Sequence, residues 1–251
     1  MHSFECALEI VPDGGVDFVL RRATHFPPGE TAAGRGAGAP KLPVNPFLDP
    51  DPALVVEALG DTHVALLNKF SVLREHLLVV TRRFVVQRAP LDLADFAALS
   101  QVMAGAEVLA FFNGGSEAGA SQGHKHLQVV TLPLSPRRAV PMAALFEPGG
   151  ARPPFAHAWL PLAPEDLALP DTLLSKYRAA MAAGRVGDGP YNMVLTREGM
   201  LVVPRERDKF EDISINALAF AGSLFVRDRA HEETIVRAGP MRVLQQVAAA
   251  R

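Results

Sequence analysis

Apolar residues occur along the chain in short runs that are bounded mainly by glycine, proline or charged residues. Runs of this length that are rich in Val, Leu and Thr predict β-strands. We expect strands over residues 63–70, 76–81, 108–112, 124–133, 191–196 and 200–203. Only a few residues separate the first two runs, and likewise the last two, which predicts two hairpins. Residues 1–22 predict a leading strand or a short helix.

Other segments carry helix signals. Asp92 is suited to cap a helix that runs to about residue 107, because apolar residues recur at helical spacing after it. A second helix is expected from Pro164 to about residue 183, and a final one begins near Pro240. The acidic and proline-rich residues 49–52 also predict a short helix over residues 53–59, ended by Gly60.

Hairpins with a few helices between them predict an α+β protein with a mainly antiparallel sheet and flanking helices. Nine prolines from Pro133 to Pro170 mark a winding connection. We therefore expect an N-terminal lobe over residues 1–145 and a C-terminal lobe over residues 155–251, packed as one globular unit. Residues 26–46 are mostly Pro, Gly and Ala, which predicts a long irregular loop.

Composition excludes several classes of protein. The 251 residues carry a formal net charge of −2, without the basic excess of a general nucleic-acid binder. No apolar run approaches the roughly 20 residues that span a bilayer, and the N-terminus does not read as a secretory signal. Cys6 is the only cysteine, which excludes an intrachain disulfide and a thiolate zinc cluster. We expect a cytoplasmic protein with neither nucleic acid nor membrane as a partner.

The candidate chemistry lies in the sequence His-Lys-His-Leu-Gln at residues 124–128. Alternate side chains of a strand leave the same face, so His124, His126 and Gln128 project together. They follow the Gly-rich residues 113–123, where small side chains allow backbone N–H groups to approach phosphate oxygens. Two imidazoles and a carboxamide beside such a loop predict a site for an anionic group.

Three interpretations of this strand compete. The histidines can lie by chance on a half-buried strand. A His-x-His pair can also bind a metal ion, but no nearby His, Asp or Glu has the spacing of a third ligand. Alternatively, one imidazole nitrogen attacks an electrophile while the other is held by a hydrogen bond that fixes the tautomer. Histidine suits nucleotidyl transfer because a phosphoramidate forms and breaks readily, and Gln128 would donate to a non-bridging oxygen. We favour the nucleophile and expect no protein-bound metal.

The motif H-x-H-x-Q resembles the branch of the histidine-triad superfamily in which glutamine replaces the last histidine. The surrounding sequence resembles the diadenosine tetraphosphate (Ap4A) phosphorylases, also called ATP adenylyltransferases, which implies a histidine-triad-like fold. The resemblance covers most of the chain from about residue 45. Its matching blocks are residues 45–47, 67–70, 112–113, 119–128, 191–192, 196–197, 203–205 and 215–228.

The resemblance implies a reaction and a set of residues. His126 would attack an α-phosphorus of Ap4A, expel ATP and hold AMP covalently, after which inorganic phosphate would release ADP. His124 would orient His126 through its backbone carbonyl group, and Gln128 would complete the catalytic group. The implied substrate contacts are Lys41, Asn68, Lys69, Asn113, Gly119, Ala120, Ser121, Gln122, Asn216, Ala217, Leu218, Ser223 and Arg227. We expect no cofactor bound by the protein itself, although Mg²⁺ can arrive with the nucleotide.

The chain departs from the family pattern at a few positions. Arg227 stands where a lysine is expected, and Gly199 replaces an aromatic residue. A hydrolase and a sugar-1-phosphate nucleotidylyltransferase built on the same strand remain alternatives, as does a non-catalytic nucleotide sensor. The presence of both His126 and Gln128 argues against the sensor.

Overall fold

A computed structural model of the chain describes residues 6–23, 45–69, 71, 73 and 75–251. Its largest feature is an eight-stranded sheet in which every neighbouring pair of strands is antiparallel. In spatial order the strands are β3 (Val55–Leu59), β4 (His63–Leu67), β5 (Leu77–Thr81), β7 (His126–Thr131), β6 (Val108–Gly114), β9 (Tyr191–Leu195), β10 (Gly199–Pro204) and β8 (Ala158–Pro161). This sheet and its flanking helices confirm the α+β class and both predicted hairpins.

A three-stranded sheet joins segments from near the two ends of the chain. Its strands are β1 (Cys6–Asp13), β2 (Val16–Ala23) and β13 (Ser223–Val226), and β13 runs parallel to β2. The hairpin of β1 and β2 turns through Gly14 and Gly15, whose positive φ values suit a two-residue turn. Each of the two sheets therefore contains strands from before and from after residues 145–155 in the chain. The connection between the two predicted lobes does not separate one sheet from the other.

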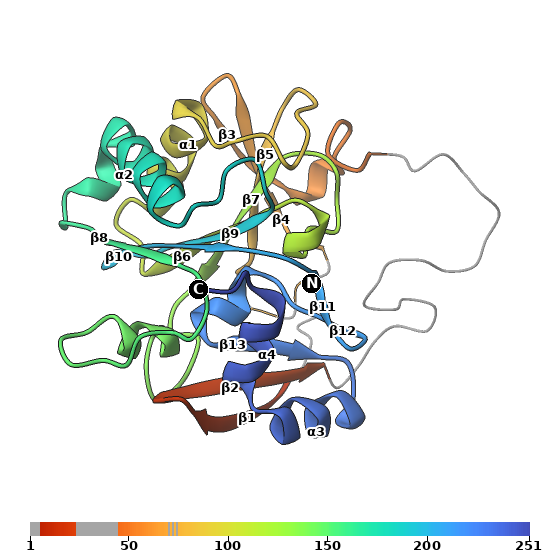
Figure 1. Ribbon diagram of the computed structural model, residues 1–251. Coiled ribbons are helices and arrows are strands. Elements are labelled where there is room, and N and C mark those ends of the chain that lie inside the picture. The colour runs from red at the N-terminus through yellow and green to blue at the C-terminus, as the bar shows by residue number, and fades with distance from the viewer. Residues whose placement is uncertain (1–5, 24–44, 70, 72, 74) are drawn as a thin grey trace.

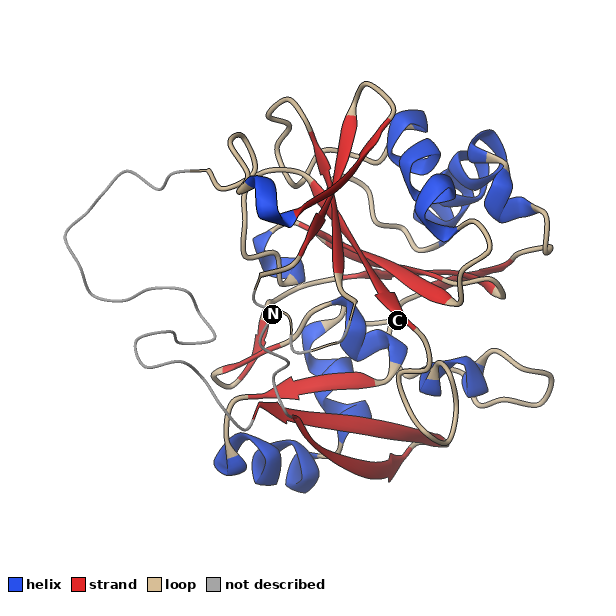
Figure 2. Cartoon of the chain, turned by 180° about the vertical axis from the view of Figure 1, so that it is seen from behind, coloured by secondary structure: helices blue, strands red, loops and turns tan. Residues whose placement is uncertain are grey.

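Helices and the smaller sheet cover opposite faces of the large sheet (Figures 1 and 2). Helices α1 (Leu93–Met103) and α2 (Pro170–Ala183) cover one face, where Leu127 and Val129 of β7 join their apolar core. The three-stranded sheet, α3 (Arg229–Ala238) and α4 (Pro240–Val247) lie on the other side, where Val130 belongs to a second core. Strand β7 is thus buried between two apolar layers. The short elements are η1 (Pro52–Leu54), η2 (Ser116–Ala118), η3 (Pro141–Leu145), η4 (Asp166–Ala168), η5 (Ala217–Ala221), β11 (Lys209–Phe210) and β12 (Ile213–Ser214).

Some of the secondary-structure elements predicted from the sequence differ from those in the structure. The helix expected over residues 53–59 is a single 3-10 turn followed by the edge strand β3. The β-branched side chains of Val55 and Val56 favour extended backbone, and pairing with β4 supplies the hydrogen bonds of this segment. Helix α2 begins at Pro170 rather than Pro164, and α3 was not predicted. The loop expected over residues 26–46 lies almost wholly outside the described residues.

Lys125 anchors the start of β7 to the helical layer. Its side chain is 2% exposed, and its Nζ donates to Asp95 Oδ2 at 2.5 Å and to the carbonyl group of Pro90 at 2.8 Å. Asp95 belongs to the capping box of α1 and also accepts a hydrogen bond from His63 Nε2 at 3.0 Å. Burial alone would raise the pKa of Asp95, but His63 and Lys125 bring it below its ordinary value. The carboxylate is therefore a buried anion that depends on these partners.

We predict that Lys125→Met lowers the free energy of unfolding by about 3–5 kcal/mol, because it leaves the Asp95 charge buried without its cation. Urea denaturation measures this loss. Lys176 is a matched control, since its Nζ also contacts a proline carbonyl group and an aspartate, but its side chain is 31% exposed. Lys176→Met should cost less than about 1 kcal/mol. Equal losses for the two variants would contradict the assigned role of the buried pair.

Candidate active site

The two histidines of the motif lie on one side of the sheet, as their spacing predicts. The Phe47 ring packs against both imidazoles, with centroid separations of 5.7 Å to His124 and 5.2 Å to His126. Strand β7 begins at His126, whereas His124 lies just before it and pairs with Val86 in an isolated β-bridge. Lys125, between the two histidines, points to the helical layer on the opposite side.

The environment of His126 fixes one tautomer of its ring. The side chain is buried, and its Nδ1 lies 2.9 Å from the backbone oxygen of His124. A carbonyl oxygen only accepts, so Nδ1 carries the proton and Nε2 keeps its lone pair. Burial lowers the pKa of His126 to about 4, so the ring is neutral near pH 7. Among the described residues, none forms a hydrogen bond with Nε2, which is the arrangement of an available nucleophile.

His124 is itself held by two neighbours. Its Nε2 lies 2.8 Å from the backbone oxygen of Thr81 and therefore donates, while Nδ1 accepts from the side-chain amide of Asn45 at 2.9 Å. Desolvation lowers the pKa of His124 as well. With both ring nitrogens used, the residue is fixed in place, and so is the carbonyl group that orients His126.

The Gln87 side chain bridges the backbones of β6 and β7 at the point where their direct pairing ends. Its amide nitrogen donates to the carbonyl groups of Asn113 and His126 at 2.8 and 3.2 Å, and its oxygen accepts from the His126 N–H at 2.9 Å. The direct pairing of these strands ends at Phe111 and Gln128, so the Gln87 side chain replaces the backbone partner that is missing there. Sequence analysis missed this residue, because a glutamine beside an exposed Val86 carries no local signal.

A buried polar network joins Asn113 to the C-terminal half of the chain. The Asn113 side-chain oxygen accepts from Asn192 and from the N–H group of Ala217, each at 2.9 Å. Arg205 donates to the side-chain oxygen of Asn192 and to the carbonyl groups of Ala118 and Ile215. Burial lowers the pKa of Arg205 to about 10, which leaves it charged near pH 7. The network therefore brings β6, the Gly-rich loop and η5 together beside His126.

The Gly-rich loop is closed at its base. The N–H groups of Gly119 and Ala120 donate to Ser116 and Gly115 within the loop, so they do not face a phosphate as expected. A Cβ atom on Gly119 would lie 2.7 Å from the backbone oxygen of Ile215, which explains the need for glycine there. Residues 121–123 are exposed, and their N–H groups form no backbone hydrogen bond among the described residues. Among the described residues of this loop, the N–H groups at its tip, unlike those of Gly119 and Ala120, are therefore not used by the loop's own backbone.

The other predicted substrate residues lie outside the Gly-rich loop. Asn68 contacts His76, which lies near Gln128, and the next residue, Lys69, is exposed. The Asn216 side chain caps η5 by accepting from the N–H group of Leu218. Lys41 lies outside the described residues.

Ser223 and Arg227 make their polar contacts in the three-stranded sheet and its surroundings. Ser223 is buried and accepts from Arg21 of the neighbouring strand β2. Arg227 forms ion pairs with Asp212 and Asp228. These contacts do not join either residue to the strand of His126, so their role toward substrate stays a prediction.

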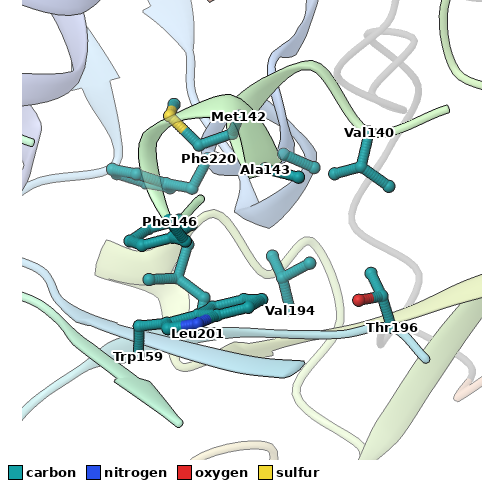
Figure 3. A pocket seen from close by; sticks show the side chains of 10 residues that line it. Val140, Met142, Ala143, Phe146, Trp159, Val194, Thr196, Leu201 and Phe220 are labelled. Atoms are coloured by element: carbon teal, nitrogen blue, oxygen red, sulfur yellow. The ribbon is translucent and has the colours of Figure 1, made fainter. Parts of the chain in front are cut away.

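An apolar cavity of about 10 Å³ lies between β9, β10, η3 and η5. It has room for only about one water molecule, so it is not a nucleotide site. Figure 3 shows Trp159 and Phe146 beside it, and their rings stack at 4.5 Å. A Cβ atom on Gly199 would lie 2.3 Å from the Trp159 ring. The absence of a side chain at Gly199 thus leaves room for Trp159.

Two kinds of site do not occur in the part of the chain that the structure describes. No group of three His, Cys, Asp or Glu side chains there is arranged to hold a metal ion. No described helix has the length and apolar character to cross a membrane.

Two family models together match nearly the whole chain. Residues 1–148 match the family model of the Ap4A phosphorylase N-terminal domain, and residues 151–250 match that of the ATP adenylyltransferase C-terminal domain. The diadenosine 5',5'''-P1,P4-tetraphosphate phosphorylase 2 of Saccharomyces cerevisiae is 31% identical in an alignment that covers 76% of this chain and 71% of the yeast protein.

Solved structures show the same fold. The crystal structure of yeast Ap4A phosphorylase Apa2 in complex with AMP superposes with a TM-score of 0.76 and 26% identity, covering 99% of this chain and 90% of the yeast chain. The complex of the same yeast protein with Ap4A gives a TM-score of 0.78 at 24% identity, covering 100% and 92%.

We predict that His126 titrates near pH 4 in the folded protein and near its ordinary value of about 6.5 in the urea-unfolded chain. NMR titration of the ring resonances, assigned by their loss in His126→Ala, measures both values. The unfolded state then binds more protons between these pH values, so stability falls as the pH drops through this window. A folded-state midpoint near 6.5 would show that the ring is not desolvated as described.

Proposed function

Because the chain belongs to the Ap4A phosphorylase (ATP adenylyltransferase) family, we propose that it cleaves Ap4A with inorganic phosphate into ADP and ATP. The observation that carries this proposal is the fixed tautomer of His126, which leaves Nε2 unprotonated and without a protein partner among the described residues. The yeast enzyme Apa2, crystallised with AMP and with Ap4A, supports the choice of substrate.

In the first step, His126 Nε2 attacks an α-phosphorus of Ap4A. A bond forms between nitrogen and phosphorus, and the bond from that phosphorus to the bridging oxygen breaks, so ATP leaves with the electron pair. The imidazole gains positive charge, which the His124 carbonyl group stabilises through the proton on Nδ1. AMP is then held covalently on His126, with the Gln128 amide group donating to a non-bridging oxygen.

In the second step, an oxygen of inorganic phosphate attacks the same phosphorus. The bond between nitrogen and phosphorus breaks, ADP leaves, and His126 returns to its neutral form. Dividing the reaction into two displacements uses the same imidazole as the nucleophile of the first step and as the leaving group of the second, as in other covalent mechanisms. The depressed pKa of His126 favours this return, because a neutral ring is the stable state of the buried site.

Substrate contacts follow from the placement of the predicted residues. We propose that Asn68 and Lys69 beside Gln128, and Ser121 and Gln122 at the loop tip, bind the polyphosphate chain. Lys41, which lies outside the described residues, and Arg227 remain proposed contacts. Mg²⁺ would enter with the polyphosphate, which supplies most of its oxygen ligands.

We predict that the purified protein forms ADP and ATP from Ap4A only when inorganic phosphate is present, as chromatography of the nucleotides would show. His126→Ala should lose at least about 1,000-fold in kcat, because it removes the nucleophile. His157→Ala is a matched control, since that ring also bonds through Nδ1 to the carbonyl group two residues earlier, at 2.8 Å, and its pKa is also lowered by burial. It should keep its activity.

Two results would contradict the proposal. AMP and ATP formed without phosphate would identify a hydrolase. Full turnover by His126→Ala would exclude the covalent mechanism.

A further inference from the structure

His76 is a titratable side chain at the site that the proposed reaction does not use. It lies directly before β5, which pairs with β7 so that Leu78 is opposite Gln128. The His76 Nε2 lies 2.9 Å from Gln128 Oε1, and the ring packs against Phe111 with a centroid separation of 5.9 Å. The ring is therefore held against the carboxamide that would stabilise charge on the substrate.

The neighbours of His76 determine which ring nitrogen carries its proton. Gln128 Oε1 only accepts, so His76 Nε2 donates. Nδ1 then holds the lone pair, and it lies 3.2 Å from the amide nitrogen of Asn68, which is a donor. The hydroxyl group of Ser71 lies 3.1 Å from the same nitrogen but donates its hydrogen to the carbonyl group of Leu73, so the donor to Nδ1 is the Asn68 amide group. Burial lowers the pKa of His76 to about 4, so the neutral ring keeps this arrangement near pH 7.

The bond from His76 decides what Gln128 presents to the substrate. With its oxygen on His76, the carboxamide turns its NH₂ group the other way, on the strand face that it shares with His126. That nitrogen has no hydrogen bond to another described residue. A carboxamide rotated by half a turn would instead present its oxygen to a phosphoryl oxygen, and two acceptors repel each other. Gln128 therefore stabilises negative charge in only one of its two orientations.

We propose that His76 is a positioning residue for Gln128: its Nε2–H group holds the carboxamide oxygen, so that the amide nitrogen faces the phosphoryl oxygens. This inference rests on the proposed adenylyl transfer, since it assigns Gln128 a donor role in both displacements. The charge on the non-bridging oxygens changes as the reaction proceeds. Its difference from the charge in the bound substrate is largest at the two transition states. Loss of His76 should therefore lower kcat more than it raises KM.

The experiment compares His76→Phe and His76→Gln, in the natural chain and combined with Gln128→Ala. Phenylalanine keeps a ring against Phe111 and removes the donor, whereas glutamine places an amide N–H group near the former Nε2. His76→Phe should lower kcat for phosphorolysis of Ap4A by about 10- to 100-fold, by analogy with the loss of one donor to a developing oxyanion. His76→Gln should recover most of this loss, and thermal unfolding verifies that both variants fold.

Non-additivity separates positioning from a general structural effect. Adding His76→Phe to Gln128→Ala should change kcat by less than about 2-fold, because the group that His76 positions is already absent. The same loss in both backgrounds would overturn the inference. A ¹⁵N NMR spectrum of the ligand-free natural chain gives a second test that needs no variant to fold. It should show His76 protonated at Nε2, and a proton on Nδ1 would overturn the inference.

These outcomes are distinct from failure of the proposed function. If the natural chain performs no phosphorolysis, or if His126→Ala keeps full turnover, the proposed function fails whatever the tautomer of His76. If phosphorolysis depends on His126 and Gln128 but not on His76, only the positioning role fails.

Discussion

The hydrogen bond from His126 Nδ1 to the backbone oxygen of His124 is the interaction on which the site depends. It determines which nitrogen carries the proton, and therefore which nitrogen can attack. The bond needs a rigid carbonyl group, and the structure supplies one by using both ring nitrogens of His124 and by clamping the His126 backbone with Gln87. A single atom is thus oriented by neighbours on three different segments.

Burial keeps the His126 ring in the neutral form that can act as a nucleophile. Strand β7 lies between two apolar layers, so a charged imidazole is disfavoured and the pKa of His126 falls to about 4. The neutral ring is then available near pH 7, and the same desolvation keeps His76 neutral. Each imidazole at the centre of the site has one proton and a defined acceptor for it, so the tautomers follow from geometry.

Two buried cationic side chains, Lys125 and Arg205, join the segments that surround the site, on opposite sides of the sheet. Lys125 pairs with Asp95 and fixes the start of β7 to α1. Arg205 instead donates to carbonyl and carboxamide oxygens, and so joins the Gly-rich loop to η5 and to the C-terminal helix. These acceptors are neutral and do not cancel the Arg205 charge, but the nearby Asp208 carboxylate favours the charged form of Arg205. The two halves of the chain meet at this network.

The sequence by itself determined the class of fold, the hairpins of β4 with β5 and of β9 with β10, and the common face of His124 and His126. These follow from alternation along one strand and from short connections, which are local properties of the chain. It failed at residues 53–59, where pairing with β4 overrides the helix-start signals, and at residues 1–22, where the hairpin was not distinguished from a helix.

Only the tertiary structure decided which partners surround the reacting atom. His76 and Gln128 are 52 positions apart, Gln87 and His126 are 39 apart, and Arg205 and Ala118 are 87 apart. No local sequence pattern predicts contacts between residues so far apart in the chain, because each contact forms only when the folded sheet brings the two segments together. The same holds for the N–H groups of Gly119 and Ala120, which the loop's own fold turns inward. Tautomers and pKa shifts arise from burial and hydrogen bonding, and these exist only once the chain is folded.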